Sequence, residues 1–215
     1  MENSADRSRG VGILLVATAI ASVALLLNHP GDHATDFAGV LKEEAANQMI
    51  NGVVHGGFIV VLAVQLACYA IFTGRIGARP LAIAGMTFFA LGAALQIGSL
   101  VVDGLMLPQI AARYLAAPPD RLPYAKSLFA LCGTAVMILM PMGLFFQGVG
   151  VASWGGALMR VARIAGVLAF LLGVAVMAAV ARAASTGTMM LLMVAIALLA
   201  LWALVAGETL FRRTA

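Results

Sequence analysis

The residues best suited to chemistry lie in one short stretch, residues 28–55 ("NHPGDHATDFAGVLKEEAANQMINGVVH"). It holds all three histidines of the 215-residue chain and four of its nine acidic residues. Imidazole suits zinc, copper, iron and nickel, and three protein ligands leave a fourth position open for water or a substrate. We therefore take His29, His33 and His55 as candidate ligands of a transition metal, with zinc, copper or iron as the ion.

The histidine spacing also leaves simpler readings open. There is no HExxH motif, and Pro30 and Gly31 between His29 and His33 argue against a shared helical face. His29 and His33 could be polar residues of a solvated loop. Haem is less favoured, because His29 and His55 are the one available axial pair and no CxxCH attachment motif exists.

Two polar stripes suggest where His55 points. Residues three or four apart share one face of a helix. The first stripe, on a continuous helix, contains Glu44, Gln48, Asn51 and His55. The second contains Gln96, Ser99 and Asp103. Because lipid cannot satisfy polar groups, both stripes should face the protein interior. We expect them to line a ligand-binding pocket with His55 and Asp103 at its centre.

The composition indicates an integral membrane protein. Hydrophobic residues make up 63% of the chain, charged residues 10%, and the mean hydropathy is +1.04. Soluble domains average about 45–50% apolar and roughly 25% charged residues. The net charge of +4 comes from basic residues scattered between apolar runs, so we expect the lipid bilayer as a partner and no nucleic acid.

Six segments are apolar and long enough to span a bilayer, which requires about 20 residues each. They are residues 11–28, 50–73, 81–103, 127–147, 164–181 and 188–207. The first has no convincing cleavage site after it, so we interpret it as a retained helix. Turn chemistry separates the segments, including the glycine-rich "GVGVASWGG" after the fourth. We predict an all-α fold: one domain, residues 1–215, forming a compact bundle of six transmembrane helices.

The basic residues predict the orientation of this bundle. With the N-terminus inside, eight lie on the cytoplasmic side: Arg7, Arg9, Arg75, Arg79, Arg160, Arg163, Arg212 and Arg213. Five lie outside: Lys42, Arg113, Arg121, Lys126 and Arg182. The positive-inside rule then places both termini in the cytoplasm and the histidines on the outer side. We expect a bacterial inner (plasma) membrane.

Several side chains between and within the spans carry smaller expectations. Residues 35–47 could form a short interfacial helix with Thr35 as N-cap, and residues 105–117 could continue the third span past Pro108. Trp154 is placed in an interfacial aromatic belt with Tyr114 and Tyr124. Gln65 and Gln147 suit interhelical hydrogen bonds.

Methionines near the outer side raise a further option. They are Met49, Met106, Met189, Met190 and Met193. Thioether sulfur favours Cu(I), so a His/Met copper site is conceivable, although methionine also fills apolar cores.

Three functions are compatible with these residues. The first is a pocket facing the extracytoplasmic side that binds a small ligand or cation, for transport or sensing. The second is a membrane-embedded metal-dependent enzyme acting on a lipid or quinone, with Asp103 or Glu44 as general base. The third is an accessory subunit of a membrane complex, and a homo-oligomer is compatible with each of the three.

Overall fold

A computed structural model describes residues 4–31, 34–77 and 79–212, and every regular element in these ranges is helical. The elements are α1 (Ser4–Leu27), α2 (Phe37–Ala46), α3 (Gln48–Arg75), α4 (Pro80–Val101), the π-helical turn η1 (Val102–Met106), α5 (Leu107–Leu115), the 3₁₀ turn η2 (Pro119–Arg121), α6 (Leu122–Leu158), α7 (Arg163–Thr186) and α8 (Met189–Arg212). The all-α expectation is confirmed.

Six helical stretches are long and apolar enough to cross a membrane, which confirms the polytopic bundle. They are Ser8–Leu27, Gln48–Arg75, Pro80–Leu115, Pro119–Leu158, Arg163–Thr186 and Met189–Phe211. Large apolar side chains are exposed on their outer faces, among them Ile20, Val60 and Leu171. Such a surface is stable only against lipid, because the hydrophobic effect disfavours it in water.

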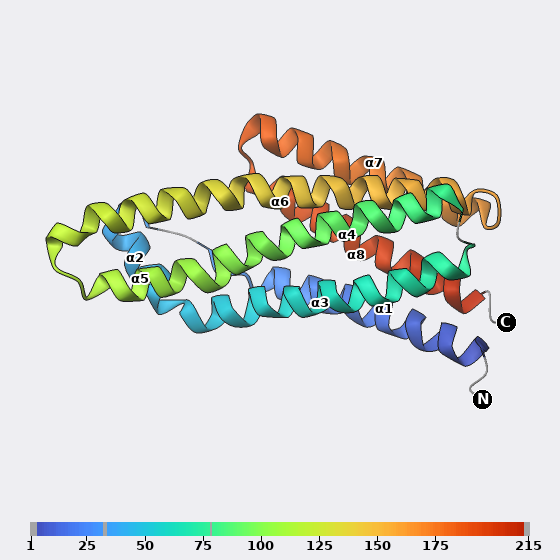
Figure 1. Cartoon of the computed structure of the whole chain (residues 1–215), viewed down its shortest axis with the longest axis horizontal. Coiled ribbons are helices and arrows are strands. Elements are labelled where there is room, and N and C mark those ends of the chain that lie inside the picture. Colours follow the sequence, from blue (N-terminus) through green and yellow to red (C-terminus); the bar gives the residue numbers. More distant parts are fainter. Residues whose placement is uncertain (1–3, 32–33, 78, 213–215) are drawn as a thin grey trace.

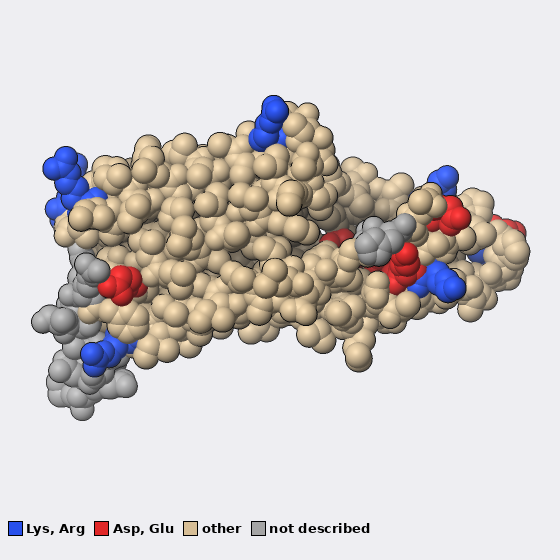
Figure 2. All heavy atoms as spheres, turned by 180° about the vertical axis from the view of Figure 1, so that it is seen from behind, with Lys and Arg blue, Asp and Glu red and all other residues tan. Residues whose placement is uncertain are grey.

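The six long helices form a closed ring in chain order. Each packs against the next, and α1 packs against both α3 and α8, so the last helix meets the first (Figure 1). The start of α1 and the end of α8 lie at the same end of the bundle, which we call the terminal end. Figure 2 shows most charged side chains of one face near its two ends, with one basic group midway along the upper edge and a broad uncharged surface over much of the rest. The positive-inside expectation assigns the terminal end to the cytoplasm.

The opposite end carries a cap that projects beyond the other helices (Figure 1). We define the cap as α2, α5 and residues 119–130. It exists because Pro80–Leu115 and Pro119–Leu158 are 36 and 40 residues long, about 54 and 60 Å at 1.5 Å per residue, against a hydrocarbon thickness of about 30 Å. Helix α2 packs on α5, and Phe37 meets Phe129 edge-on with ring centroids 5.5 Å apart.

The N-cap predicted for the short helix is wrong by one residue. Asp36, and not Thr35, caps α2, because its carboxylate accepts a 2.7 Å hydrogen bond from the backbone N–H of Gly39. The predicted continuation past Asp103 is correct, since α5 runs on to Leu115.

The glycine-rich "GVGVASWGG" does not end the fourth span, contrary to expectation. These residues lie inside α6, and the turn comes at residues 159–162. Their glycines are contact points: a Cβ added to Gly150 would lie 2.7 Å from the Gly85 carbonyl oxygen, and one added to Gly155 would lie 2.9 Å from the Gly166 carbonyl oxygen. In lipid, close backbone approach at small residues drives helix association, so here glycine joins helices instead of breaking one.

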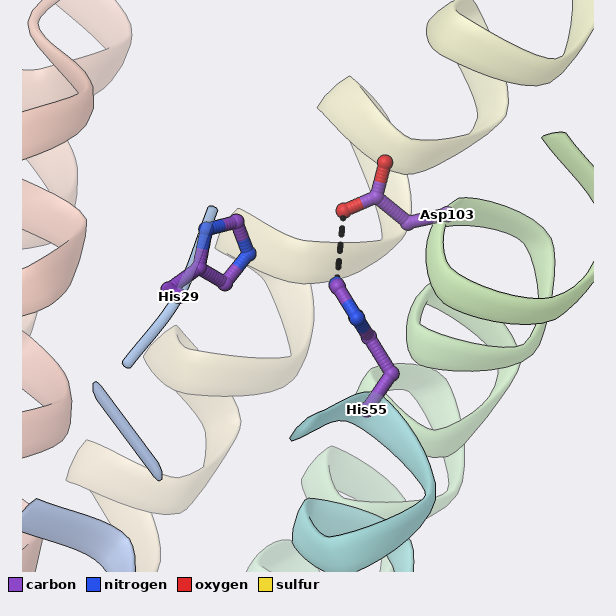
Figure 3. A group of neighbouring side chains, drawn as sticks. All are labelled: His29, His55 and Asp103. Atoms are coloured by element: carbon purple, nitrogen blue, oxygen red, sulfur yellow. Dashed lines mark hydrogen bonds and ion pairs between the residues drawn. The ribbon is translucent and has the colours of Figure 1, made fainter. Parts of the chain in front are cut away.

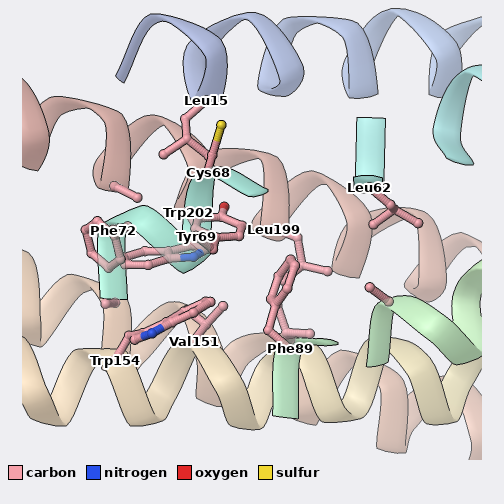
Figure 4. Close-up of a cluster of buried hydrophobic side chains, with 14 of the residues drawn as sticks. Leu15, Leu62, Cys68, Tyr69, Phe72, Phe89, Val151, Trp154, Leu199 and Trp202 are labelled. Atoms are coloured by element: carbon pink, nitrogen blue, oxygen red, sulfur yellow. The ribbon is translucent and has the colours of Figure 1, made fainter. Parts of the chain in front are cut away.

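Trp154 is also misplaced by the sequence interpretation. It lies fully buried inside the ring, not in an interfacial belt. It stacks on Trp202 with centroids 5.8 Å apart, and its indole N–H donates to the Thr73 hydroxyl at 3.0 Å. Tyr69, Phe72 and Phe89 complete this aromatic plug (Figure 4). Aromatic rings therefore fill the axis of the bundle in its terminal half.

The predicted interhelical hydrogen bonds are present. The amide of Gln65 donates to the Thr18 hydroxyl at 3.4 Å and joins α3 to α1. The amide of Gln147 donates to the Gln96 side-chain oxygen at 2.7 Å and joins α6 to α4.

Replacing Gly143 with alanine should loosen the contact between α4 and α6. The new Cβ would lie 2.7 Å from the Gly92 carbonyl oxygen and 2.9 Å from the Gln96 backbone nitrogen, both rigid backbone atoms. We expect a loss of about 1–3 kcal/mol, typical of overpacking. Thermal unfolding in detergent, followed by tryptophan emission, measures it.

The matched control is Gly133→Ala in the same helix, where nothing lies within 4 Å of the added Cβ. It should leave the apparent melting temperature unchanged or raise it, because alanine favours the helix. Equal melting temperatures for the two variants would contradict a tight glycine contact between α4 and α6.

Candidate metal site

His55 and Asp103, one from each polar stripe, lie side by side at the candidate site. His55 lies on α3 and is 2% exposed, while Asp103 lies in η1 at the end of α4. The imidazole Nε2 and the carboxylate Oδ2 are 3.2 Å apart (Figure 3). The Asp103 side chain is 33% exposed, so the pair lies at the boundary between the buried interior of the helix ring and the exposed surface near the cap.

The second nitrogen of His55 determines what this pair can do. Its Nδ1 lies 2.9 Å from the backbone carbonyl oxygen of Asn51. A carbonyl can only accept, so Nδ1 carries the proton and Nε2 presents a lone pair in the neutral ring. That lone pair faces a carboxylate oxygen. Two acceptors are stable at this distance only with a cation between them, either a proton on Nε2 or a metal ion.

The π-helical turn positions Asp103. Pro108 has no backbone N–H to donate to Gly104, and its ring clashes with that carbonyl in a regular helix. The chain responds with an i→i−5 bond from the Leu107 N–H to the Val102 carbonyl. Gly104 lies directly against the imidazole, so that any Cβ at this position would overlap the ring atoms of His55. Such π turns occur often at functional sites.

His29 brings a third ligand group to this point. It follows the end of α1, and its ring meets that of His55 at a centroid distance of 5.0 Å (Figure 3). One ligand atom from each of His29, His55 and Asp103 lies within 4.8 Å of the other two. Ligands of a tetrahedral zinc ion stand roughly 3.5 Å apart, so about 1 Å of closure would form a three-ligand site with one open position.

A cavity adjoins the three ligand groups. Its volume is about 90 Å³, and it reaches from His29, His55 and Asp103 inward to Gln96 and Phe58. Pockets for drug-sized ligands measure about 300–1,000 Å³, so this space suits an ion with its water and is too small for a porphyrin. The space-filling view shows the surface hollowed beside the cap, with acidic atoms in the hollow (Figure 2).

The remaining residues of the first stripe divide into two groups. Asn51 is buried and donates from its side-chain amide to the Glu44 carboxylate at 3.0 Å, so both support His55 from the cap side. Gln48 is exposed and borders a separate surface hollow with Met49 and Val53. The predicted continuous helix is absent, because α2 and α3 meet at Asn47, so Glu44 lies on a different helix from Gln48, Asn51 and His55.

The second stripe lies inside the ring, as expected. Gln96 lines the cavity and pairs with Gln147. Ser99 is fully buried, and its hydroxyl has no hydrogen-bond partner among the described residues. His33, the third histidine proposed as a ligand, lies outside the described residues.

Gly104 and the cavity-lining residues Met137 and Met140 are additions that the sequence interpretation missed. A signal for Gly104 was present: it follows the acidic Asp103 and precedes Pro108 by the four residues at which proline disturbs a helix. The α6 residues had only their helical spacing, which is shared by ordinary core positions.

The chain matches no known protein family, no curated protein and no solved structure at a significant level. The inference of function therefore depends on the residues and geometry of the site itself.

Gly104→Ala should displace the His55 ring. The added Cβ would overlap the imidazole, so we expect a loss of about 1–3 kcal/mol and a changed Nε2 signal in nuclear magnetic resonance spectra of ¹⁵N-histidine-labelled protein. Gly98→Ala on the same helix is the control, since its Cβ would make one ordinary contact, 3.7 Å from Leu139.

A double-mutant cycle makes this test specific for the ring contact. In a His55→Gly background the ring and the His55 Cβ, both of which the added methyl would overlap, are gone, and Gly104→Ala should no longer destabilise the protein. An equal cost of Gly104→Ala with and without His55 would show that Gly104 does not hold the imidazole.

Proposed function

We propose that this protein captures a transition-metal cation in a pocket facing the extracytoplasmic side of the membrane, for transport or sensing. The observation that carries the proposal is the opposition of the His55 Nε2 lone pair and the Asp103 carboxylate, 3.2 Å apart. This arrangement requires a positive charge between the two atoms. His29 supplies a second imidazole within reach of the same point.

The donor set favours a borderline metal over a hard one. Two imidazoles and one carboxylate suit zinc, copper, iron or nickel, whereas magnesium and calcium prefer all-oxygen sites. Asn51 and Glu44 form an outer layer of hydrogen bonds around these ligands. The Asn51 backbone carbonyl orients the His55 ring, and the Asn51 side-chain amide donates to the Glu44 carboxylate. Such outer partners fix the tautomer of a ligating histidine and raise ligand affinity.

The two halves of the ring support capture from one side. The cavity lies at the cap end, and the aromatic plug fills the axis toward the terminal end. An ion entering from the cap end therefore meets packed rings beyond the site. This favours sensing or gated transport over an open channel, and the charge distribution favours a bacterial inner membrane with the cap outside.

A second candidate function rests on a different observation. A hollow of about 300 Å³ lies between α6, α7 and α8, and it shares Met137, Pro141, Met189 and Leu192 with the cavity walls. Apolar molecules in the outer leaflet would reach the metal through it. A metal-dependent enzyme acting on a lipid or quinone would use such a path, with Asp103 as general base.

Removing a ligand should abolish metal capture. We expect protein purified without chelators to bind one zinc ion per chain, and His55→Ala to weaken binding by at least about 100-fold, the upper end of what loss of an outer partner costs. His29→Ala and Asp103→Asn should weaken it as well. Isothermal titration and metal analysis measure the change.

Asp120→Asn is the matched control, because this cap carboxylate is exposed and pairs only loosely with the neighbouring Arg121, at 3.8 Å. It should bind zinc like the unmodified protein, and His33→Ala asks whether the third histidine contributes. A chain that takes up no zinc, copper, iron or nickel would refute the proposed function.

Metal binding should release a proton. If a proton holds His55 and Asp103 together in the empty site, an incoming metal ion displaces it, so about one proton should leave per ion bound and affinity should fall as the solution is acidified. Titration in buffers of different ionisation enthalpy counts the protons. In Asp103→Asn the amide can donate to Nε2 without an added proton, so the release should disappear. A binding heat that is independent of the buffer would contradict this mechanism.

A further inference from the structure

The cavity beside the metal site has methionine walls. Met137 and Met140 come from α6, and Met189 and Met193 come from α8. The nitrogen and oxygen ligands arise from the end of α1, from α3 and from η1. The cavity therefore brings two donor sets together from different helices, one of imidazole and carboxylate and the other of thioether sulfur.

Helical spacing directs both methionine pairs at the same space. Met137 and Met140 are three residues apart, and Met189 and Met193 are four apart, so each pair occupies one face of its helix. Three methionines expected near this depth do not join them: Met49 is 82% exposed, Met190 is 72% exposed and Met106 is 45% exposed, and none borders the cavity. The four lining methionines are thus distinguished by their place in the cavity wall and not by burial, since Met137, Met189 and Met193 are themselves 52%, 52% and 41% exposed.

Thioether sulfur discriminates between metals. It is a soft ligand that selects Cu(I), whereas zinc and iron are bound well by imidazole and carboxylate alone. A site with three protein ligands has an open position, and all three ligand residues line the cavity that the methionines also line. A methionine sulfur from the wall can occupy it, and its flexible, unbranched side chain adapts to the ion.

We propose that the cation held at this site is cuprous copper, bound by the histidines together with thioether sulfur from the Met137/Met140 and Met189/Met193 pairs. This inference rests on the proposed metal-capture function and names its ion. The nearby lipid-facing hollow between α6 and α8 keeps this side of the site apolar, which suits a singly charged soft ion.

The test compares Cu(I) and Zn(II) on the full-length protein in detergent. Cu(I) is titrated without oxygen against a coloured Cu(I) chelator, and zinc is titrated separately. The variants are the double substitutions Met137→Leu with Met140→Leu, and Met189→Leu with Met193→Leu. Leucine keeps the volume, so packing is preserved. Met190→Leu is the matched control on α8, one residue from the cavity-facing Met189.

We expect at least one leucine pair to lower Cu(I) affinity by about tenfold or more, a free-energy change of about 1.4 kcal/mol, while zinc affinity stays within about twofold. Met190→Leu should change neither affinity. X-ray absorption at the copper edge should detect sulfur around the ion, and the sulfur signal should fall in the affected pair.

The possible results distinguish failure of the cuprous assignment from failure of the proposed metal-capture function. If zinc binds but Cu(I) does not, or if both leucine pairs leave Cu(I) affinity unchanged, the cuprous assignment is overturned and metal capture stands. If neither ion binds the unmodified protein, the cuprous assignment falls, and metal capture itself falls with it if iron and nickel also fail to bind.

Discussion

Hydrocarbon offers no hydrogen-bond partner, and this constraint governs the placement of most buried polar side chains described in the bundle, with the Ser99 hydroxyl and the Trp202 indole N–H as exceptions. Gln65 pairs with Thr18, Gln147 with Gln96, and Trp154 with Thr73, each across two helices. These pairs are complete because each joins a donor to an acceptor. His55 and Asp103 obey the same requirement but present two acceptors to each other, since the Asn51 carbonyl already takes the one proton of the neutral ring. At the His55–Asp103 pair, therefore, a proton or a metal ion has to lie between the two acceptor atoms to satisfy both of them.

The side chains along the bundle axis are of two kinds, rigid aromatic rings in the terminal half and flexible methionines in the cap half. In the terminal half, Tyr69, Phe72, Phe89, Trp154 and Trp202 pack ring against ring and leave little freedom for rearrangement. In the cap half, methionines surround a small space and can change rotamer at low cost. The rigid aromatic half beneath the flexible methionine half would let the proposed ion adjust its coordination without disturbing the helix ring, which glycine contacts hold together.

The fold follows from the sequence more fully than the site does. Long apolar runs specify six spans, because few other structures can place so much apolar surface. The same reasoning failed at "GVGVASWGG", since glycine that breaks a helix in water allows helix contact in lipid. Helical spacing brought His55 and Asp103 together, yet it also placed Gln48 at the site, although this first residue of α3 is exposed and borders a separate hollow. The approach of His29 depends on a loop, whose path no periodicity encodes.

The π turn makes the site depend on residue count as well as residue type. A π turn is in effect one residue inserted into an α-helix, and each residue of an α-helix advances the chain by about 100°. The π turn at Val102–Met106 therefore rotates the side-chain directions of α5 relative to those of α4. Shortening this segment by a single residue would leave every ligand type intact, yet it would rotate either Asp103 away from α3 or the cap away from α2. Lineages of this chain could thus gain or lose the site through one codon insertion or deletion, with the apolar pattern of the spans untouched.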